Sequence, residues 1–156
     1  MILKPSENFY SLVEHFEGLK LTAYKDVAGI WTIGYGTTHY QDGTAVKEGD
    51  TITIDDARNY LKIQSENITL PLELSQSQFD ALLSFAYNVG QHAFNGSTLK
   101  KDIAAKADAD KITADFCMWD RAHIDGKLIE VKGLLRRRKS EAYLFINGVN
   151  HPTFYE

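Results

Sequence analysis

The spacing of apolar residues predicts a helix near the beginning of the chain. Apolar residues recur at the i, i+3, i+4, i+7 spacing within residues 9–16, which is typical of a helix with one buried face. Ser6 is a suitable N-cap, and Gly18 is the residue type that ends helices in the left-handed conformation. Glu17 is therefore expected at the C-terminal end of a short amphipathic helix.

Between residues 19 and 48 the pattern changes to β-branched and aromatic residues broken by turns. Residues 21–24 and 30–35 have the composition of strands. Glycine and polar residues interrupt them at 26–29, and the segment 40–43 has the composition of another turn. This predicts a small antiparallel sheet of about three short strands.

Beyond this segment the spacing becomes helical again. Thr53 with Asp56, and Ser75 with Gln78, have the sequence of capping boxes, which start helices. The first of these helices is expected to continue to about Pro71. The second is apolar on more than one side, so we expect it to be buried all round.

Three more helices are predicted over residues 97–106, 110–119 and 133–146, with a tight turn at Asp125-Gly126 before the last. A helix, a small sheet and a set of helices indicate an α+β fold that is mostly α. A chain of 156 residues with 44% hydrophobic and 24% charged residues is typical of one globular domain.

Composition gives no sign of a cofactor. The five histidines lack metal-ligand spacing, and no P-loop or dinucleotide glycine pattern is present, so we expect neither a metal nor a nucleotide cofactor. A net charge of -4 gives no general reason to expect nucleic acid. Cys117, the single cysteine, is expected to be a buried apolar filler rather than a nucleophile.

The first residues lack the apolar core of a signal peptide, and no apolar run approaches the roughly 18 residues of a membrane span. We therefore expect a protein that is made in the cytoplasm and does not insert stably into membranes.

Two carboxylates and a hydroxyl stand out between the first helix and the predicted sheet. Glu17 lies at a helix end, Asp26 at a strand turn, and Thr32 further along the sheet. Cleavage of a glycosidic bond needs one protonated and one ionised carboxyl in different environments, and the negative end of a helix dipole disfavours the anion of Glu17. The alternative is that both acids are ordinary solvated residues.

The chain resembles the phage lysozymes of glycoside hydrolase family 24 in three segments. Glu17-Gly18, Asp26 nine positions on, and Thr32-Ile33-Gly34-Tyr35-Gly36 are similar to the first motif of that family. Residues 78–90 resemble its central helix, and residues 133–141 resemble its Gly-Leu-x-x-Arg-Arg-x-x-Glu helix. The three segments follow the order of the family over nearly the whole chain.

The resemblance implies a single lysozyme-like domain over residues 1–156. A small helix and sheet lobe over about 15–53 and a helical lobe over about 70–156 would be joined by the helix from about residue 54. The N-terminal helix would contribute to the helical lobe, and a sugar cleft would lie between the lobes.

Carried over by position, Glu17 is the general acid, Asp26 supports the attacking water as base, and Thr32 holds that water. Inversion would follow if the two carboxyls stand about 6.5 to 9.5 Å apart. The implied enzyme is a muramidase that hydrolyses the β-1,4 bond between N-acetylmuramic acid and N-acetylglucosamine in bacterial peptidoglycan. The resemblance further implies a monomeric phage or prophage endolysin that reaches the cell wall from the host cytoplasm through a holin-type pore.

Thr38, Tyr87 and Asn88 are expected to contact the substrate, with core packing as the alternative for the last two. Many family members have histidine where this chain has Thr37, which puts one supporting polar contact in doubt; His39 lies two positions on. For residues 136–138, all arginine, three interpretations stay open: a solvated helix face, a contact with the acidic helix end near Glu14 or Glu17, and a contact with anionic cell wall.

Three other functions compete with this interpretation. A lytic transglycosylase also cuts peptidoglycan but adds no water, and the Asp26 and Thr32 pair argues against it. A non-catalytic wall-binding module would have kept the cleft without activity. A nucleic-acid binder would have to use the four basic residues at 136–139, which are few for an acidic chain.

Overall fold

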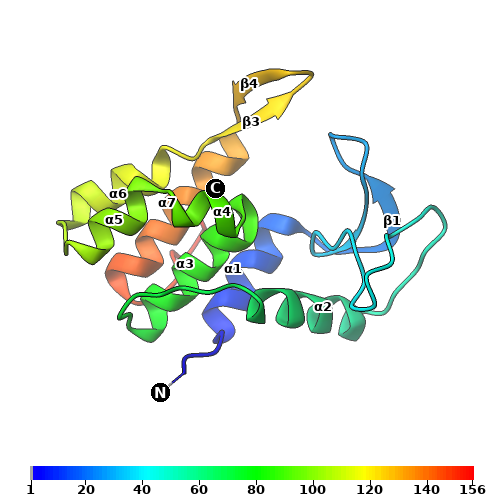
Figure 1. Cartoon of the computed structure of the whole chain (residues 1–156), viewed down its shortest axis with the longest axis horizontal. Helices are drawn as coiled ribbons and strands as arrows, with labels where there is room; N and C mark the ends of the chain where they lie inside the picture. The colour runs from blue at the N-terminus through cyan, green and yellow to red at the C-terminus, as the bar shows by residue number, and fades with distance from the viewer. Residues whose placement is uncertain (1) are drawn as a thin grey trace. The chain divides into compact units, whose positions relative to one another are not determined.

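A computed structural model describes residues 2–156, which divide into two compact units (Figure 1). Val13–Asn67 forms the smaller unit, and the residues up to Leu12 together with Ile68–Glu156 form the larger one. The first helix, α1 (Glu7–Glu17), begins in the larger unit and ends in the smaller one.

The smaller unit consists of a two-stranded antiparallel sheet, a long loop and one helix. Its elements are β1 (Lys20–Lys25), β2 (Trp31–Gly34) and α2 (Ile54–Glu66). Tyr24 pairs with Thr32 across the sheet. The predicted third strand is wrong: within the described residues, this loop forms only isolated bridges such as His39 with Ala45. Gly36 and Gly43 adopt positive φ angles there, so the backbone turns too often for a ladder to extend.

Helix α2 begins as predicted, because Thr53 and Asp56 form both hydrogen bonds of a capping box. Its buried residues Ala57, Leu61 and Ser65 recur every fourth position. It ends at Glu66 rather than near Pro71. Beyond its end, the side chain of Gln91 binds the N–H and the carbonyl oxygen of Thr69 at 2.7 and 2.8 Å, in place of helical hydrogen bonds.

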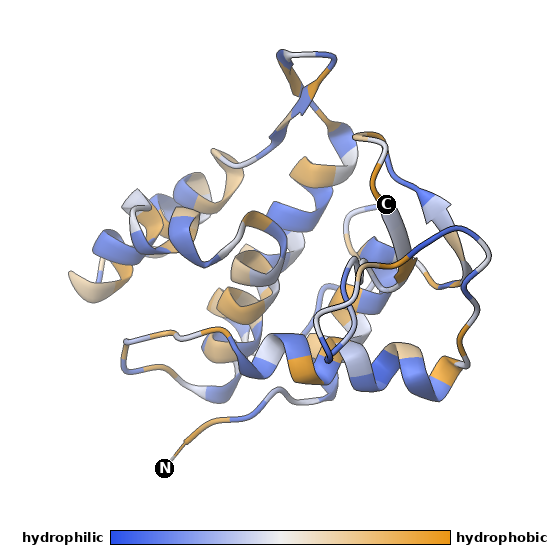
Figure 2. Cartoon of the chain, turned by 45° about the vertical axis from the view of Figure 1, so that its right-hand side comes forward, coloured by the Kyte–Doolittle hydropathy of each residue, from blue (hydrophilic) through white to orange (hydrophobic). Residues whose placement is uncertain are grey.

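The larger unit is built around α3 and α7, which pack against each other and are covered by shorter helices (Figure 1). After the first turns of α1, its elements are α3 (Gln76–Val89), α4 (Gln91–Asn95), α5 (Thr98–Ala104), α6 (Ala109–Cys117), β3 (Arg121–Ile124), β4 (Lys127–Glu130) and α7 (Lys132–Asn147). Hydrophobic and hydrophilic residues alternate along these helices, as one-sided burial requires (Figure 2).

The core of the larger unit is aromatic. Phe85 on α3 contacts Phe94, Phe116 and Trp119 edge to face, at ring-centroid distances of 6.4, 5.6 and 5.7 Å. The middle of α3, from Ala81 to Ala86, is buried throughout, which confirms the prediction of a central helix without a solvent face. The core therefore depends on α3 as its common partner.

At the start of α1, Ser6 supplies the first helical carbonyl oxygen, but its hydroxyl does not cap the helix. The hydroxyl donates to the buried Asp80 on α3, and the Ser6 N–H donates to the same carboxylate at 3.0 Å. A side chain of α3 thus fixes the beginning of α1.

The hairpin formed by β3 and β4 projects from the helices of this unit (Figure 1). Only its turn was predicted. Asp125 and Gly126 both have positive φ angles, 50° and 77°, as a two-residue hairpin turn requires. All four residues of β4 are exposed. Because no face of this strand is buried, its sequence lacks the alternating apolar pattern that predicts a strand.

Candidate active site

Glu17 is the last residue of α1 and is half-buried. Gly18 follows with φ 69°, and its N–H donates to the carbonyl oxygen of Glu14 at 3.1 Å. The left-handed residue ends the helix, as predicted from the sequence. Glu17 therefore lies where the chain leaves the helix and enters the sheet.

Asp26 is held in the loop that joins β1 to β2. Its N–H donates to the carbonyl oxygen of Ile30 at 3.0 Å, and its carbonyl accepts from Gly29 at 2.9 Å. The carboxylate accepts hydrogen bonds from the N–H groups of Ala28 and Ile30, both at 2.9 Å, and both use Oδ1. The loop thus fixes the orientation of the carboxyl group through one oxygen.

Thr32 lies on β2 and is 4% exposed. Its hydroxyl donates to the carbonyl oxygen of Ile30 at 2.9 Å. Because the hydroxyl proton is engaged there, the lone pairs of Oγ1 serve as acceptors. The peptide groups of Ile30 therefore bind both Asp26 and Thr32, and fix one relative to the other.

All three predicted residues lie in the smaller unit, and Tyr24 is related to each of them. Burial raises the pKa of its phenol, and the charges of Glu17 and then Asp26 raise it further. Tyr24 also pairs with Thr32 across the sheet. One side chain is thus opposite the predicted hydroxyl and within electrostatic range of both predicted acids.

Sequence reasoning missed the ion pair beside this site. Glu14, one turn before the end of α1, lies 3.0 Å from Arg58 on α2. The buried Tyr35 is close to both charges: after burial, Glu14 raises its pKa, and Arg58 lowers it. Arg58 on α2 therefore compensates the negative charge of the acidic helix end. The spacing of residues along the chain does not reveal this pair.

The predicted substrate contacts lie in different units. Thr38 is half-buried in the smaller unit, with Oγ1 3.1 Å from Nδ1 of the exposed His39. Tyr87 is half-buried and Asn88 is exposed, both on α3 of the larger unit. Their contact with substrate stays a prediction.

Thr37, where many family members have histidine, is 1% exposed, and its hydroxyl donates to Oε1 of Gln64 at 3.4 Å. Gln64 in turn donates to the carbonyl oxygen of His39 at 3.4 Å. The Thr37 hydroxyl is therefore bound by an amide on α2.

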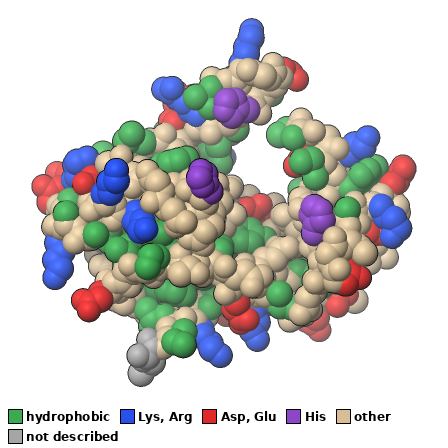
Figure 3. All heavy atoms as spheres, viewed as in Figure 1, with side chains coloured by type: hydrophobic (Ala, Val, Ile, Leu, Met, Phe, Trp, Pro, Cys, Tyr) green, Lys and Arg blue, Asp and Glu red, His purple; other side chains and the backbone are tan. Residues whose placement is uncertain are grey.

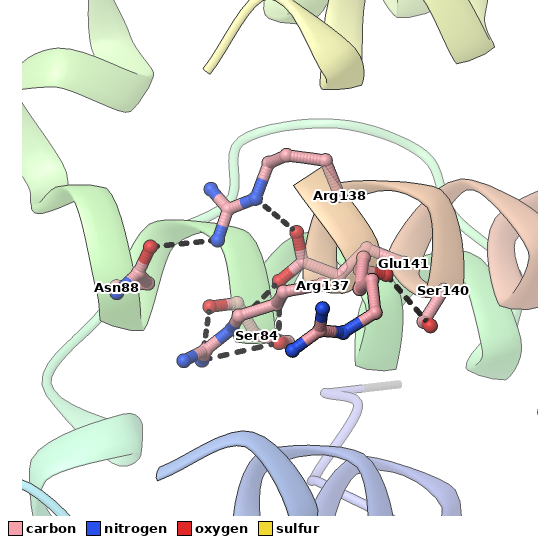
Figure 4. A network of polar contacts seen from close by, with 7 residues as sticks. Ser84, Asn88, Arg137, Arg138, Ser140 and Glu141 are labelled. Atoms are coloured by element: carbon pink, nitrogen blue, oxygen red, sulfur yellow. Dashed lines mark hydrogen bonds and ion pairs between the residues drawn. The ribbon is translucent and has the colours of Figure 1, made fainter. Parts of the chain in front are cut away.

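The interpretation of residues 136–138 as a solvated helix face is wrong for two of the three arginines. Arg137 and Arg138 are 3% and 0% exposed, and both pair with the fully buried Glu141 (Figure 4). Nη2 of Arg138 also donates to Oδ1 of Asn88 at 2.6 Å. The two side chains join α7 to α3, because Arg137 binds Ser84 and Arg138 binds Asn88, and buried charges need such polar partners.

Ser84 completes this network from α3. Its hydroxyl donates to Oε2 of Glu141 at 2.5 Å, and its carbonyl accepts from Nη2 of Arg137 at 3.2 Å. Of residues 136–139, Arg136 and Lys139 are therefore left exposed.

On the face shown in Figure 3, acidic and basic side chains are interspersed.

Residues 2–156 contain no group of three or more His, Cys, Asp or Glu side chains arranged to hold a metal. They also contain no helix long and apolar enough to cross a membrane. Cys117 is half-buried rather than fully buried, and burial raises the pKa of its thiol.

The sequence model of the phage lysozyme family matches residues 14–141. An endolysin of Acyrthosiphon pisum secondary endosymbiont phage 1 is 36% identical over 146 residues, which cover 90% of this chain and 96% of that protein. Some relatives are longer: the chain spans 53% of the endolysin of Bacillus phage PZA, to which it is 38% identical.

Solved structures agree with this assignment. The endolysin of Escherichia coli O157:H7 phage FAHEc1 superposes with a TM-score of 0.87 at 34% identity, covering 97% of this chain and 98% of that one. The muramidase domain of SpmX from Asticaccaulis excentricus gives a TM-score of 0.77 at 31% identity, covering 93% and 99%. The chain belongs to the phage lysozyme family.

Proposed function

We propose that the chain is a muramidase that hydrolyses the β-1,4 bond between N-acetylmuramic acid and N-acetylglucosamine in bacterial peptidoglycan, and that it acts as a phage endolysin in host cell lysis. Membership of the phage lysozyme family and similarity to endolysins and a muramidase domain support this. The observation that carries the proposal is that the peptide groups of Ile30 bind both Asp26 and Thr32, while Glu17 ends the helix that leads into the same sheet.

In the proposed reaction, Glu17 donates a proton to the glycosidic oxygen as the bond to the anomeric carbon breaks. A water molecule attacks that carbon from the opposite face of the sugar. Asp26 takes a proton from this water, and Oδ2 is suited to it because both backbone hydrogen bonds use Oδ1. Thr32 accepts the second hydrogen of the water, because its own proton is donated to Ile30. The configuration at the anomeric carbon is inverted.

Product analysis tests this reaction. Digestion of purified peptidoglycan is expected to give reducing ends, heavier than the anhydro ends of a transglycosylase by one water, about 18 Da. Proton NMR of a short glycan early in the digestion is expected to show the α anomer first, because a β bond is inverted. Anhydro ends would identify a transglycosylase, and the β anomer would contradict inversion.

Substitution of the two acids tests the roles assigned to them. Glu17→Gln and Asp26→Asn are each expected to lower kcat by at least about 100-fold, since each removes a proton-transfer group. Binding to intact walls and the melting temperature should stay near wild type. The matched control is Glu48→Gln, on the exposed loop of the same unit, which should leave kcat unchanged. Full activity of either acid variant would overturn its assignment.

The release route is part of the same proposal. Expressed in a bacterial cytoplasm, the chain is expected to lyse the cell only when a holin-type pore is co-expressed, and a monomer is expected by light scattering. Lysis without the pore would contradict this route.

A further inference from the structure

Tyr24 belongs geometrically to the site but has no role in the reaction described above. It lies directly opposite Thr32 in the β1–β2 ladder. Side chains of directly opposed residues in an antiparallel pair lie on the same face of the sheet, with Cβ atoms about 4.5–5.5 Å apart. The phenol and the Thr32 side chain are therefore neighbours.

Asp26 lies two residues beyond Tyr24 along the chain. Its N–H donates to Ile30 at 3.0 Å, so pairing between the two chain segments continues one step beyond β1, and its carboxylate accepts from the Ile30 N–H at 2.9 Å. Ile30 also accepts from the Thr32 hydroxyl, which ties Asp26 to the residue opposite Tyr24. The charges of Glu17 and Asp26 both raise the pKa of the phenol, which agrees with this proximity.

The phenol is a hydrogen-bond donor at neutral pH. Burial, Glu17 and Asp26 all raise its pKa above the usual value of 10.0, so the hydroxyl keeps its proton. Within residues 2–156 this hydroxyl makes no hydrogen bond to the protein, whereas the hydroxyl of Tyr40 in the same unit donates to Asp50 at 2.7 Å. The donor capacity of Tyr24 is thus unused by the fold.

The proposed nucleophile lacks such a donor. A water that gives one hydrogen to Asp26 and the other to Thr32 has both its donors engaged and two lone pairs left. One lone pair must point at the anomeric carbon. The second needs a donor to fix the rotation of the water, and neither Asp26 nor Thr32 can supply one, because the carboxylate only accepts and the hydroxyl proton of Thr32 is donated to Ile30.

We propose that Tyr24 is a further catalytic residue, whose hydroxyl donates a hydrogen bond to the attacking water and aims its reactive lone pair at the sugar. This rests on the proposed hydrolytic function. The phenol transfers no proton; it holds the water through the approach to the anomeric carbon.

Tyr24→Phe tests the proposal, since it removes only the hydroxyl and keeps the ring. With soluble glycan fragments we expect kcat to fall about ten-fold, the scale of one lost hydrogen bond, with KM and melting temperature unchanged. Tyr40→Phe is the matched control and should leave kcat at the wild-type value. An unchanged kcat for Tyr24→Phe would overturn the proposal. A rise in KM alone would also overturn it, because it would indicate a contact with the sugar rather than with the water.

A double substitution separates a shared water from a general packing effect. In a Thr32→Val background the water has lost one of its holders, so Tyr24→Phe is expected to cost less than three-fold there. An equal loss in both backgrounds would overturn the shared-water assignment. An inactive wild type would refute the hydrolytic function itself. An active wild type with an unaffected Tyr24→Phe variant would refute only the role of Tyr24.

A measurement without turnover checks the geometry. The difference in ultraviolet absorbance between wild type and Tyr24→Phe titrates this phenol alone. Its pKa is expected above 10, and Glu17→Gln should lower it. A phenol that titrates identically with and without the Glu17 charge would overturn the placement on which the proposal depends.

Discussion

Nε of Arg138 lies 2.9 Å from Oε1 of Glu141, and both side chains are completely buried. The two atoms are in ionic contact but poorly aligned for a hydrogen bond. The guanidinium also faces the ring of Phe85 at 5.0 Å, and its Nη2 binds Asn88. This pair fixes α7 against α3 at the centre of the larger unit.

Removing the buried anion should be costly. Glu141→Gln leaves two buried guanidinium groups with one fewer negative partner, and we expect the free energy of unfolding to fall by about 3–5 kcal/mol. Urea unfolding at neutral pH measures this. Glu130→Gln on the exposed strand β4 is the control and should change little. A loss below about 1 kcal/mol for Glu141→Gln would show that the anion is dispensable.

The substrate role of Asn88 can be separated from its contact with Arg138. Asn88→Asp keeps an acceptor for Nη2 of Arg138, removes the amide donors and adds a negative charge that pairs with the Arg138 guanidinium. If Asn88 binds glycan through its amide N–H, KM should rise about ten-fold, with kcat and melting temperature preserved. Kinetics on soluble fragments measure both constants. An unchanged KM would leave Asn88 with a purely structural role.

Lys111 joins two carboxyl groups across α5 and α6: its Nζ lies 3.0 Å from Asp102 and 3.1 Å from Asp115. Asp115 is 1% exposed, and burial, then its hydrogen bond with Asp102, raises its pKa. The same hydrogen bond lowers the pKa of Asp102. The pKa values of the two neighbouring carboxyls are thus shifted in opposite directions, so Asp115 binds its proton more tightly than Asp102 does.

The sign of the pH dependence follows from these directions. For Asp115, whose pKa is raised on folding, the stabilising contribution is complete below the usual value of 3.8 and is lost as pH rises through the raised value. Asp102 acts oppositely: its contribution is present above 3.8 and is lost as pH falls through the lowered value.

Asp115→Asn removes the loss at higher pH, because the amide stays neutral. The free energy of unfolding of the variant relative to wild type is expected to increase as pH rises above 3.8 through the raised pKa of Asp115. Urea unfolding across this window measures it. Asp110→Asn, exposed in the first turn of α6, should show no such increase. Parallel curves for wild type and Asp115→Asn would contradict the raised pKa of Asp115.

Gly34 is required by backbone conformation and by its neighbours. It has φ 64°, and a Cβ there would lie 3.3 Å from Ile52 and 3.4 Å from Ala57. Gly29, with φ 79°, has open space around it. Gly29→Ala should therefore cost about 1–2 kcal/mol, from the left-handed conformation alone. Gly34→Ala should cost at least about 1 kcal/mol more, from the added crowding against α2. Urea unfolding compares the two, and equal losses would contradict the crowding.

Features that depend on neighbouring residues could be predicted from the sequence. The boxes at Thr53 and Ser75 and the left-handed Gly18 form hydrogen bonds within a few residues, so the identities of those residues are enough to predict them. The placement of Glu17 at the end of a helix follows from the same local chemistry. The family resemblance then selected Glu17, Asp26 and Thr32, whose roles remain proposals for experiment.

Contacts between residues distant in sequence depend on the tertiary fold and could not be predicted. The arginines of α7 have the spacing of an ordinary surface run, yet Ser84, Asn88 and Glu141 make their burial possible. Tyr24 acquired its place from the register of β1 against β2, and the hairpin of β3 and β4 formed without a buried face to mark it. In each case the contact depends on packing between elements. Such packing fixes the environment of a side chain, but it does not produce a periodic pattern in the sequence.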